Sequence, residues 1–260
     1  MPDSPSKHLY RFVFLLLLLP GGLFAQGLQA LSFGTDSTLE LVTWNIEWFP
    51  KNGQATADSV AKVIQAIDAD IYGIQEIDDS AFFRQVINGL PDHEVHIEPG
   101  YFRGLVYVYK PSSVQLNGVY RIFDTSPYWS AFPRSPLVME FSYEGEDFVV
   151  INNHYKCCGD GLLDLSNSGD EEARRYEANS LLKQFIDLNF PSGKVILLGD
   201  LNDNLTDPTQ HNVFRMFLND TTRYSFTDLG IAQGPNYDWS FPGWPSHLDH
   251  IMVTNELYMF

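Results

Sequence analysis

The chain alternates between short runs of apolar residues and longer segments in which apolar residues recur at helical spacing. Residues 195–198 are four apolar residues in a row, a pattern typical of a strand buried on both faces of a sheet. Residues 57–66 and 171–188 carry apolar side chains three and four positions apart, which predicts helices with one buried face. Strands are predicted at residues 39–44, 71–74 and 195–198, and helices at residues 57–66, 82–90 and 171–188.

Residues 93–150 have a different character, because strand-like runs follow one another with only turns between them. Lys110-Pro111-Ser112 and Glu144-Gly145-Glu146 are such turns, so this part is expected to be antiparallel sheet. Residues 204–245 are expected to be irregular. With no internal repeat and no dividing linker, the chain predicts an α/β (α+β) four-layer sandwich, with two packed mixed β-sheets flanked by helices. The further strands are expected at residues 105–109, 114–122, 137–143, 148–152 and 248–254.

The length and charge of the chain narrow the choice of function. A chain of 260 residues is long enough for one large domain with a full core. Its formal net charge of −17 disfavours a non-specific nucleic-acid scaffold, because no basic stripe offsets the acidic residues. That charge still allows a nuclease that holds phosphate locally, and it suits a protein that binds divalent cations.

The N-terminus has the pattern of a secretory signal peptide. Lys7 and Arg11 precede an apolar run at residues 12–19, and Ala25 or Ala30 offers a small residue for cleavage. The apolar run is too short to span a membrane. We therefore expect a signal peptide at residues 1–25, a flexible leader at residues 26–38, and a secreted or periplasmic domain at residues 39–260.

The only two cysteines, Cys157 and Cys158, are adjacent. Neighbouring cysteines close only a small strained ring and lack the spacing of metal ligands, so neither a structural disulfide nor a metal site is expected. The favoured interpretation is a local loop feature, which includes the option of a redox-labile disulfide.

Polar side chains follow several of the apolar strand runs. Asp200 and Asn202 lie two apart at the end of one run, so both leave the same face if the extended geometry persists. An Asx-turn would explain these two residues alone. Repeated carboxylates at buried strand ends need a compensating cation, and a hard divalent ion prefers oxygen ligands. The strand ends carry Asn45 with Glu47, Glu76, His154, Asp200 with Asn202, and Asp249.

These residues resemble the motifs of the endonuclease/exonuclease/phosphatase superfamily, which includes deoxyribonuclease I. The resemblance covers about residues 39–260 and implies the deoxyribonuclease I-like sandwich. The matching motifs, in family order, are Trp44-Asn45-Ile46-Glu47, Gln75-Glu76, Asn152 to His154, Gly199-Asp200-Leu201-Asn202 and His247-Leu248-Asp249-His250.

The resemblance also implies a role for each position. Glu76 corresponds to the principal metal ligand, with Asn45 and Glu47 beside it, and the metal would be Mg²⁺, with Mn²⁺ or Ca²⁺ as alternatives. Asp200 and Asn202 correspond to the pair that orients the attacking water and the phosphate, and His154 to the histidine that contacts the phosphate or assists the leaving oxygen. Asp249 corresponds to the carboxylate that orients a catalytic histidine, and Arg134 to an arginine that contacts the phosphate.

One family motif has no counterpart here. The superfamily carries a Ser-Asp-His element after the position of Asp249, and no such element follows before Phe260, while His250 matches an aromatic position. The resemblance therefore predicts either a fragment or a protein of impaired activity. The favoured prediction is a monomeric, secreted, metal-dependent phosphodiester hydrolase that acts on nucleic acid. The alternatives are a phospholipid or inositol-phosphate phosphoesterase and a catalytically impaired secreted binding protein.

Overall fold

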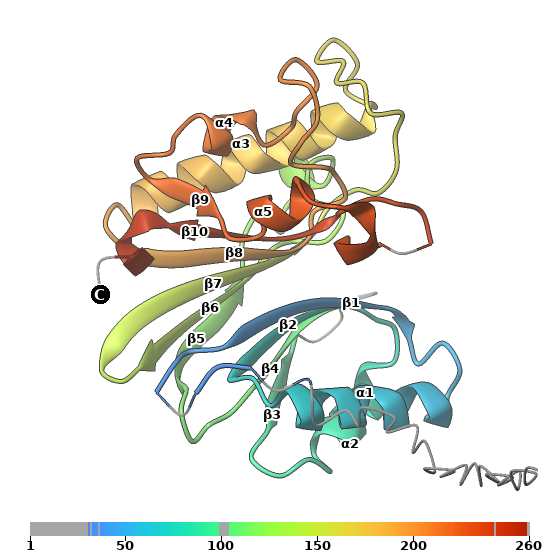
Figure 1. The fold of residues 1–260 in the computed structure, drawn as a ribbon, viewed down its shortest axis with the longest axis vertical. Coiled ribbons are helices and arrows are strands. Elements are labelled where there is room, and N and C mark those ends of the chain that lie inside the picture. The colour runs from blue at the N-terminus through green and yellow to red at the C-terminus, as the bar shows by residue number, and fades with distance from the viewer. Residues whose placement is uncertain (1–30, 32, 36, 99–103, 242, 259–260) are drawn as a thin grey trace, which may run out of the picture.

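The computed structural model describes residues 31, 33–35, 37–98, 104–241 and 243–258. The predicted signal peptide lies outside these residues. Figure 1 shows two β-sheets packed face to face with helices on both outer sides, which confirms the predicted four-layer sandwich.

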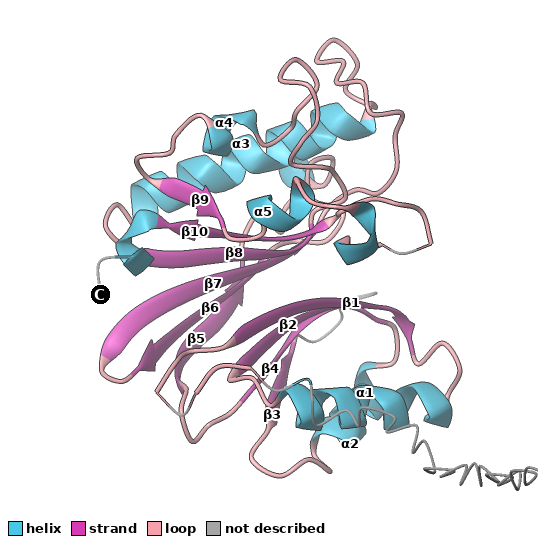
Figure 2. Ribbon diagram, viewed as in Figure 1, coloured by secondary structure: helices cyan, strands magenta, loops and turns pink. Residues whose placement is uncertain are grey.

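The first sheet is formed by the N-terminal part of the chain, in the order β1-β2-β4-β3. Helix α1 connects the parallel pair β1 and β2, and it packs with α2 on the outer face of this sheet (Figure 2). Val60 and Ile64 of α1 and Phe83 of α2 form the apolar layer beneath these helices. The elements are β1 (Leu41–Phe49), α1 (Gln54–Ile67), β2 (Ile71–Ile77), α2 (Ser80–Ile87), β3 (Glu94–Ile97) and β4 (Gly104–Tyr109).

The second sheet has the order β5-β6-β7-β8-β10-β9, and the long helix α3 covers its outer face (Figure 1). The strands are β5 (Gln115–Arg121), β6 (Leu137–Tyr143), β7 (Glu146–His154), β8 (Lys194–Asp200), β9 (Tyr224–Phe226) and β10 (Asp249–Thr254). The helices are α3 (Glu171–Asn189), α4 (Arg215–Leu218) and α5 (Leu229–Ala232), with short 3-10 turns at Ser126–Tyr128, Asn236–Asp238 and Asn255–Tyr258. Over the described residues, no helix combines the length and apolar character needed to cross a membrane.

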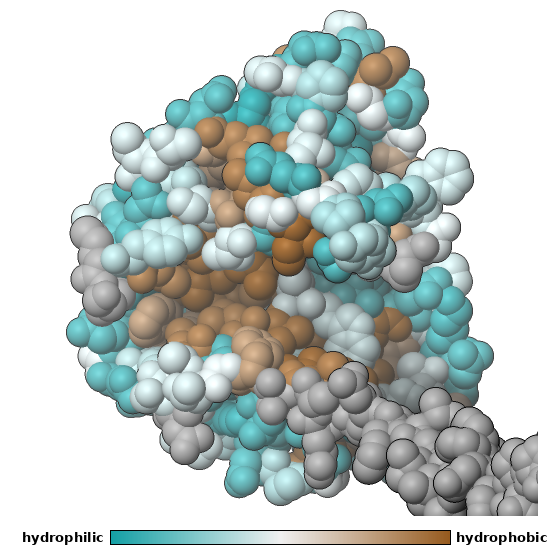
Figure 3. All heavy atoms as spheres, viewed as in Figure 1, coloured by the Kyte–Doolittle hydropathy of each residue, from teal (hydrophilic) through white to brown (hydrophobic). Residues whose placement is uncertain are grey.

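The inner faces of the two sheets share an apolar core. Leu198 of β8 and Phe141 of β6 are fully buried there, opposite Tyr107 of β4. The Tyr107 hydroxyl donates to the carbonyls of Leu137 and Val150 at 2.7 and 2.9 Å, so it joins the two sheets through hydrogen bonds. Figure 3 shows apolar residues lining the recess between the two layers on the face in view.

Strand register brings the polar strand ends to one edge of the sandwich. In the parallel pair β7 and β8, His154 lies opposite Asp200. In the antiparallel pair β8 and β10, Asp249 lies opposite the same Asp200. In β1 and β2, Asn45 lies opposite Gln75, immediately before Glu76.

The segment at residues 204–245 was expected to be irregular, and that expectation is wrong in part. It contains α4, β9 and α5. These elements are too short to show periodicity in the sequence, and they are held by tertiary packing, in which Phe214 and Phe217 contact Tyr224 and Phe226.

A buried arginine anchors the loop that follows β7. Arg175 of α3 is 2% exposed and donates from Nη1 to the carbonyls of Lys156 and Cys158, both at 2.8 Å. Its Nε donates to Asp203 at 2.8 Å, and its Nη2 lies 3.1 Å from Glu172. This contact network holds α3, the loop after β7 and the segment after β8 together.

Replacing Arg175 by leucine is expected to lower the free energy of unfolding by about 3–5 kcal/mol, because the carboxylates of Glu172 and Asp203 would stay buried without their cation. Urea unfolding measures this change. The matched control is Arg174→Leu, since the neighbouring Arg174 hydrogen-bonds only the Ser130 carbonyl on the surface. Equal losses in the two variants would contradict the prediction.

The two cysteines lie in the same loop. Both are exposed free thiols, and Cys158 Sγ lies 2.9 Å from Cys157 Sγ. Burial and the hydrogen bond to Cys157 raise the pKa of Cys158, with the hydrogen bond as the larger cause. The local loop feature is therefore present, and its redox chemistry stays a prediction.

Candidate metal centre and hydrolytic site

Asn45 lies at the centre of the site and joins two carboxylates from different sheets. Its Nδ2 donates to Asp200 Oδ2 at 2.9 Å and to Glu76 Oε1 at 3.2 Å. Its own Oδ1 accepts the backbone N–H of Glu47 at 2.9 Å. The amide is therefore fixed in one orientation, and it holds Glu76 and Asp200 at a common point between the sheets.

Irregular backbone aims Glu76 toward this point. The ladder between β1 and β2 is interrupted after Asn45, and Glu47, Trp48 and Glu76 all have positive φ angles of 47°, 57° and 66°. Such angles are uncommon for residues other than glycine and are concentrated at functional sites. The backbone N–H of Trp48 donates to Glu76 Oε2 at 3.2 Å, so both oxygens of Glu76 are oriented.

His154 brings an imidazole to the same two carboxylates. Its Nε2 lies 3.6 Å from Glu76 Oε1 and 3.8 Å from Asp200 Oδ2, and the side chain is 3% exposed. The parallel register of β7 and β8 produces this position, because the last residues of the two strands are paired.

The end of β8 requires a glycine, because the backbone of β7 approaches it closely. Gly199 has φ 143°, and a Cβ there would lie 1.9 Å from the Asn153 carbonyl oxygen. Asn202, with φ 53°, then turns back so that its N–H donates to Asp200 Oδ1 at 3.1 Å and its Nδ2 donates to the Tyr155 carbonyl at 3.3 Å. Both oxygens of Asp200 are thus held by amides from opposite sides.

Burial, with the charge of nearby carboxylates, raises the pKa of two carboxyl groups in the site. Burial, followed by the charge of Asp249, raises the pKa of Asp200 to about 7, against the lowering effect of hydrogen bonds from Asn45 and Asn202. Burial likewise raises the pKa of Asp249 to about 6, against hydrogen bonding with Ser240. Two neighbouring carboxyl groups with raised pKa values are typical of functional sites.

The raised pKa of Asp200 predicts a pH-dependent stability of the metal-free protein. A carboxyl that binds its proton more tightly when folded stabilises the protein below its ordinary pKa of 3.8, and this contribution is lost as the pH rises through about 7. Asp200→Asn cannot ionise, so its stability relative to wild type is expected to rise by about 1–4 kcal/mol between pH 4 and 8. Urea unfolding in EDTA at pH 4, 6 and 8 measures the difference, and a pH-independent difference would refute the assignment.

The structure places the two remaining predicted site residues differently from one another. The carboxylate of Glu47 is 60% exposed and forms an ion pair with Lys51 at 2.6 Å, so only its backbone N–H takes part in the site. Arg134 lies half-buried in the loop before β6. Because Leu137 of β6 pairs with Asn152 near the end of β7, Arg134 is at the same edge of the sheet as His154.

The residues present fit a hard divalent cation. Glu76, whose side chain is 13% exposed, and the buried Asp200 both accept from the Asn45 amide, and carboxylate and amide oxygens are the ligands that Mg²⁺, Mn²⁺ and Ca²⁺ prefer. Asp249 adds Oδ1, which is buried and accepts no hydrogen bond from the described residues. Such an orphaned oxygen fits a site that receives a further donor.

The sequence did not indicate which residues support Asp249. Ser240 accepts hydrogen bonds from the N–H groups of Leu248 and Asp249, both at 3.0 Å. Asp228 contacts the two histidines on either side of Asp249. Ser240 and Asp228 lie in the segment expected to be irregular, where they look like ordinary turn residues, so no local signal could have found them.

Comparison with known proteins shows the family and the fold of the chain. The model of the Endonuclease/Exonuclease/phosphatase family matches residues 42–259, and no curated protein matches the chain. Solved structures share the deoxyribonuclease I-like fold. They include D. rerio TDP2 complexed with a single-strand DNA product (15% identity, TM-score 0.63, 84% of each chain covered) and the human Nocturnin catalytic domain with bound sulfate (16%, 0.59, 82% of this chain and 80% of that one). The endonuclease/exonuclease/phosphatase from Bacteroides vulgatus is similar at 16% identity and TM-score 0.58, covering 82% of this chain and 85% of that one. The chain therefore belongs to the endonuclease/exonuclease/phosphatase family.

Proposed function

We propose that the protein is an exported, divalent-metal-dependent phosphodiester hydrolase that acts on nucleic acid as a monomer. The observation that carries this proposal is the convergence of Glu76, Asp200 and His154 around the Asn45 amide. Carboxylates gather in this way where a cation and a phosphate compensate their repulsion. The family is generally metal-dependent, and Mg²⁺ is the ion we propose.

Each residue has a distinct role in the proposed reaction. Glu76, oriented by Asn45 and by the Trp48 N–H, would hold the metal, which supplies charge neutralisation at the phosphate. Asp200, whose pKa is about 7, accepts the proton of the attacking water. Asn202 positions Asp200 through its N–H, and the His154 imidazole stabilises a phosphoryl oxygen.

Nucleic acid is proposed as the substrate on two grounds. The similar D. rerio TDP2 structure contains a single-strand DNA product. The site also offers groups for one phosphodiester rather than a long basic surface, which accords with the net charge of −17. A substrate held locally, at one phosphate, needs no extended cationic groove.

Hydrolysis assays test the proposal directly. With Mg²⁺, the protein is expected to cleave bis-p-nitrophenyl phosphate and single-stranded DNA, and EDTA is expected to stop both reactions. The proposal would be overturned if neither substrate were hydrolysed with Mg²⁺, Mn²⁺ or Ca²⁺. Asn45→Asp is a useful companion variant, because it removes the amide that joins the two carboxylates and should lower both activities.

A phospholipid or phosphorylated small molecule is the second candidate substrate. The turn that precedes Asp249 exposes Phe241 at 48% and Trp244 at 71%. Phe241 directly follows Ser240, whose hydroxyl accepts the Asp249 N–H. Exposed aromatic side chains next to a hydrolytic site can enter a membrane surface. Phosphatidylcholine vesicles distinguish the two candidates, since release of phosphocholine without DNA cleavage would favour the lipid.

Export is proposed from the N-terminal pattern alone. The mature chain is expected to begin near Gln26 or after Ala30. N-terminal sequencing of protein recovered from the medium or periplasm measures this. Intact Met1 in a cytosolic fraction would refute export.

A further inference from the structure

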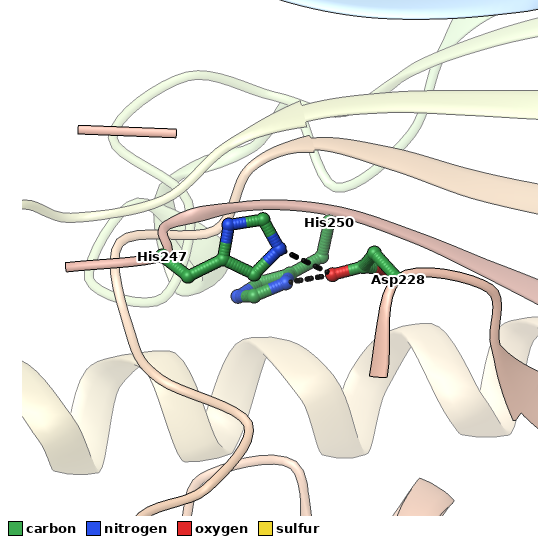
Figure 4. Close-up of side chains that lie close together, drawn as sticks. All are labelled: Asp228, His247 and His250. Atoms are coloured by element: carbon green, nitrogen blue, oxygen red, sulfur yellow. Dashed lines mark hydrogen bonds and ion pairs between the residues drawn. The ribbon is translucent and has the colours of Figure 1, made fainter. Parts of the chain in front are cut away.

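A buried cluster of ionisable side chains lies directly beside Asp249. Figure 4 shows the rings of His247 and His250 meeting at one carboxylate, that of Asp228. His247 Nε2 lies 2.9 Å from Asp228 Oδ2, and His250 Nδ1 lies 2.6 Å from the same oxygen. Asp228 precedes α5, whereas both histidines flank the start of β10, so the cluster joins segments distant in sequence.

Both ring nitrogens of His250 are engaged in hydrogen bonds. Its Nε2 lies 2.8 Å from the Asp203 carbonyl oxygen, which can only accept, so Nε2 carries a proton. Its Nδ1 faces Asp228. Although burial raises the pKa of Asp228, hydrogen bonds from His247 and His250 hold it well below its ordinary value. Asp228 therefore accepts hydrogen bonds from the two imidazoles, and its contact with His250 joins the loop before α5 to β10.

Both ring nitrogens of His247 are likewise engaged in hydrogen bonds. Its Nδ1 accepts the backbone N–H of Ser240 at 3.3 Å, so its proton is on Nε2, from which it donates to Asp228. No nitrogen of either ring has a lone pair free for a metal. The cluster therefore fits a hydrogen-bonded anchor, although its three residues have the composition of a metal site.

The anchor, formed by Asp228, His247 and His250, holds the backbone before and after Asp249. Asp228 Oδ1 accepts the N–H of Ile251 at 3.0 Å, while Oδ2 is hydrogen-bonded to the rings of His247 and His250. Asp249 is the residue between these held positions, and it pairs with Asp200 across β8 and β10. The chain can shift Asp249 only by breaking contacts to Asp228.

The ring of His250 is further fixed by packing. Phe214 and Phe226 contact it edge to face at centroid distances of 5.4 and 6.1 Å, and its side chain is fully buried. Its bond to the Asp203 carbonyl ties the start of β10 to the segment that follows Asp200. His250 thus connects the two strands that carry Asp249 and Asp200.

We propose that His250 and Asp228 are positioning residues that hold the Asp249 carboxylate opposite Asp200. This inference rests on the proposed hydrolytic function. The positioned oxygen is Asp249 Oδ1, the buried acceptor that no described residue uses. Loss of the anchor would move this oxygen relative to Asp200 while leaving the contacts between Asn45 and Glu76 in place.

The test compares His250→Phe with the packing control Phe214→Leu. Phenylalanine keeps a ring between Phe214 and Phe226 but removes both donors, whereas Phe214→Leu disturbs the same packing and keeps the donors. With Mg²⁺ and bis-p-nitrophenyl phosphate, His250→Phe is expected to lower kcat by about 10–100-fold with KM unchanged. The control is expected to stay within about threefold of wild type. Equal kcat in the two variants would overturn the inference.

A double variant separates positioning from stability. His250→Phe leaves the Asp228 carboxylate without the His250 hydrogen bond, and adding Asp228→Asn removes that carboxylate. The double variant is therefore expected to regain thermal stability relative to His250→Phe but not to regain kcat. Recovery of kcat together with stability would show a merely structural role.

Spectroscopy tests the inference without relying on activity. In metal-free protein, the ¹³Cγ signal of Asp249 is expected to shift in His250→Phe and to stay in place in Phe214→Leu. The imidazole ¹⁵N spectra of His247 and His250 are expected to stay unchanged when Zn²⁺ is added, because hydrogen bonds already engage all four ring nitrogens. An unshifted Asp249 signal, or a Zn²⁺-dependent change at His247 and His250, would overturn the inference. A wild-type protein inactive on every phosphodiester would refute the proposed function alone.

Discussion

Replacing Glu76 by alanine is expected to abolish binding of Mg²⁺ and to lower hydrolysis by about 10³-fold or more, which corresponds to about 4 kcal/mol of lost transition-state stabilisation. Glu76 is the carboxylate whose two oxygens are both oriented, one by Asn45 and one by the Trp48 N–H. Titration calorimetry with Mg²⁺ measures the binding, and initial rates on bis-p-nitrophenyl phosphate measure the hydrolysis.

Glu47→Ala is the matched control for this experiment. Glu47 is also an acidic residue at the end of β1, but its carboxylate is exposed and pairs with Lys51 on the surface. The control is expected to bind Mg²⁺ as wild type does, because only the backbone of Glu47 contacts Asn45. Unchanged Mg²⁺ affinity in Glu76→Ala, or equal losses in both variants, would sink the assignment of Glu76 as principal ligand.

Asp200→Asn is expected to lower kcat by about 10²–10⁴-fold, because asparagine cannot accept the proton of the attacking water. The substitution also places an amide where Asn45 Nδ2 now donates to a carboxylate oxygen. Mg²⁺ affinity should fall less than in Glu76→Ala. The pH dependence of kcat should lose its acidic limb, which wild type owes to protonation of the Asp200 and Asp249 pair.

Asp207→Asn provides the control for a buried carboxyl of similar proton affinity. Burial and a hydrogen bond with Asp203 raise the pKa of Asp207 to about 7, but its charged neighbours are Asp203, Arg175 and Glu172 rather than the hydrolytic group. Asp207→Asn is expected to leave the pH profile of kcat unchanged. A profile altered equally by both substitutions would show that the limb reports folding rather than chemistry.

The sequence predicted the sandwich because its long elements carry strong periodicity. The helix expected at residues 171–188 is α3 at Glu171–Asn189, and the strand expected at residues 137–143 is β6 at the same bounds. The segments α4, β9 and α5 were missed because each is short, and its apolar residues become meaningful only when they pack against one another. Periodicity needs several turns or alternations to be visible.

Some residues of the candidate site could likewise be identified from the sequence, whereas others needed the tertiary structure. Asn45, Glu76, His154 and Asp200 could be chosen from the sequence, because each is a polar residue at the end of an apolar run. The sequence could not separate Glu47 from them, since the interruption after Asn45 that turns its side chain toward Lys51 arises from the pairing of β1 with β2.

Local pattern, a property of neighbouring residues, therefore determined the strands, the helices and the polar ends of the strands. The register between strands and the packing of loops decided which ends meet. These depend on contacts between residues far apart in the chain, such as the pairing of His154 and Asp249 with Asp200. The contact between Asp228 and His250 is the clearest case, because the two residues are 22 positions apart and meet only when the loop before α5 packs against β10.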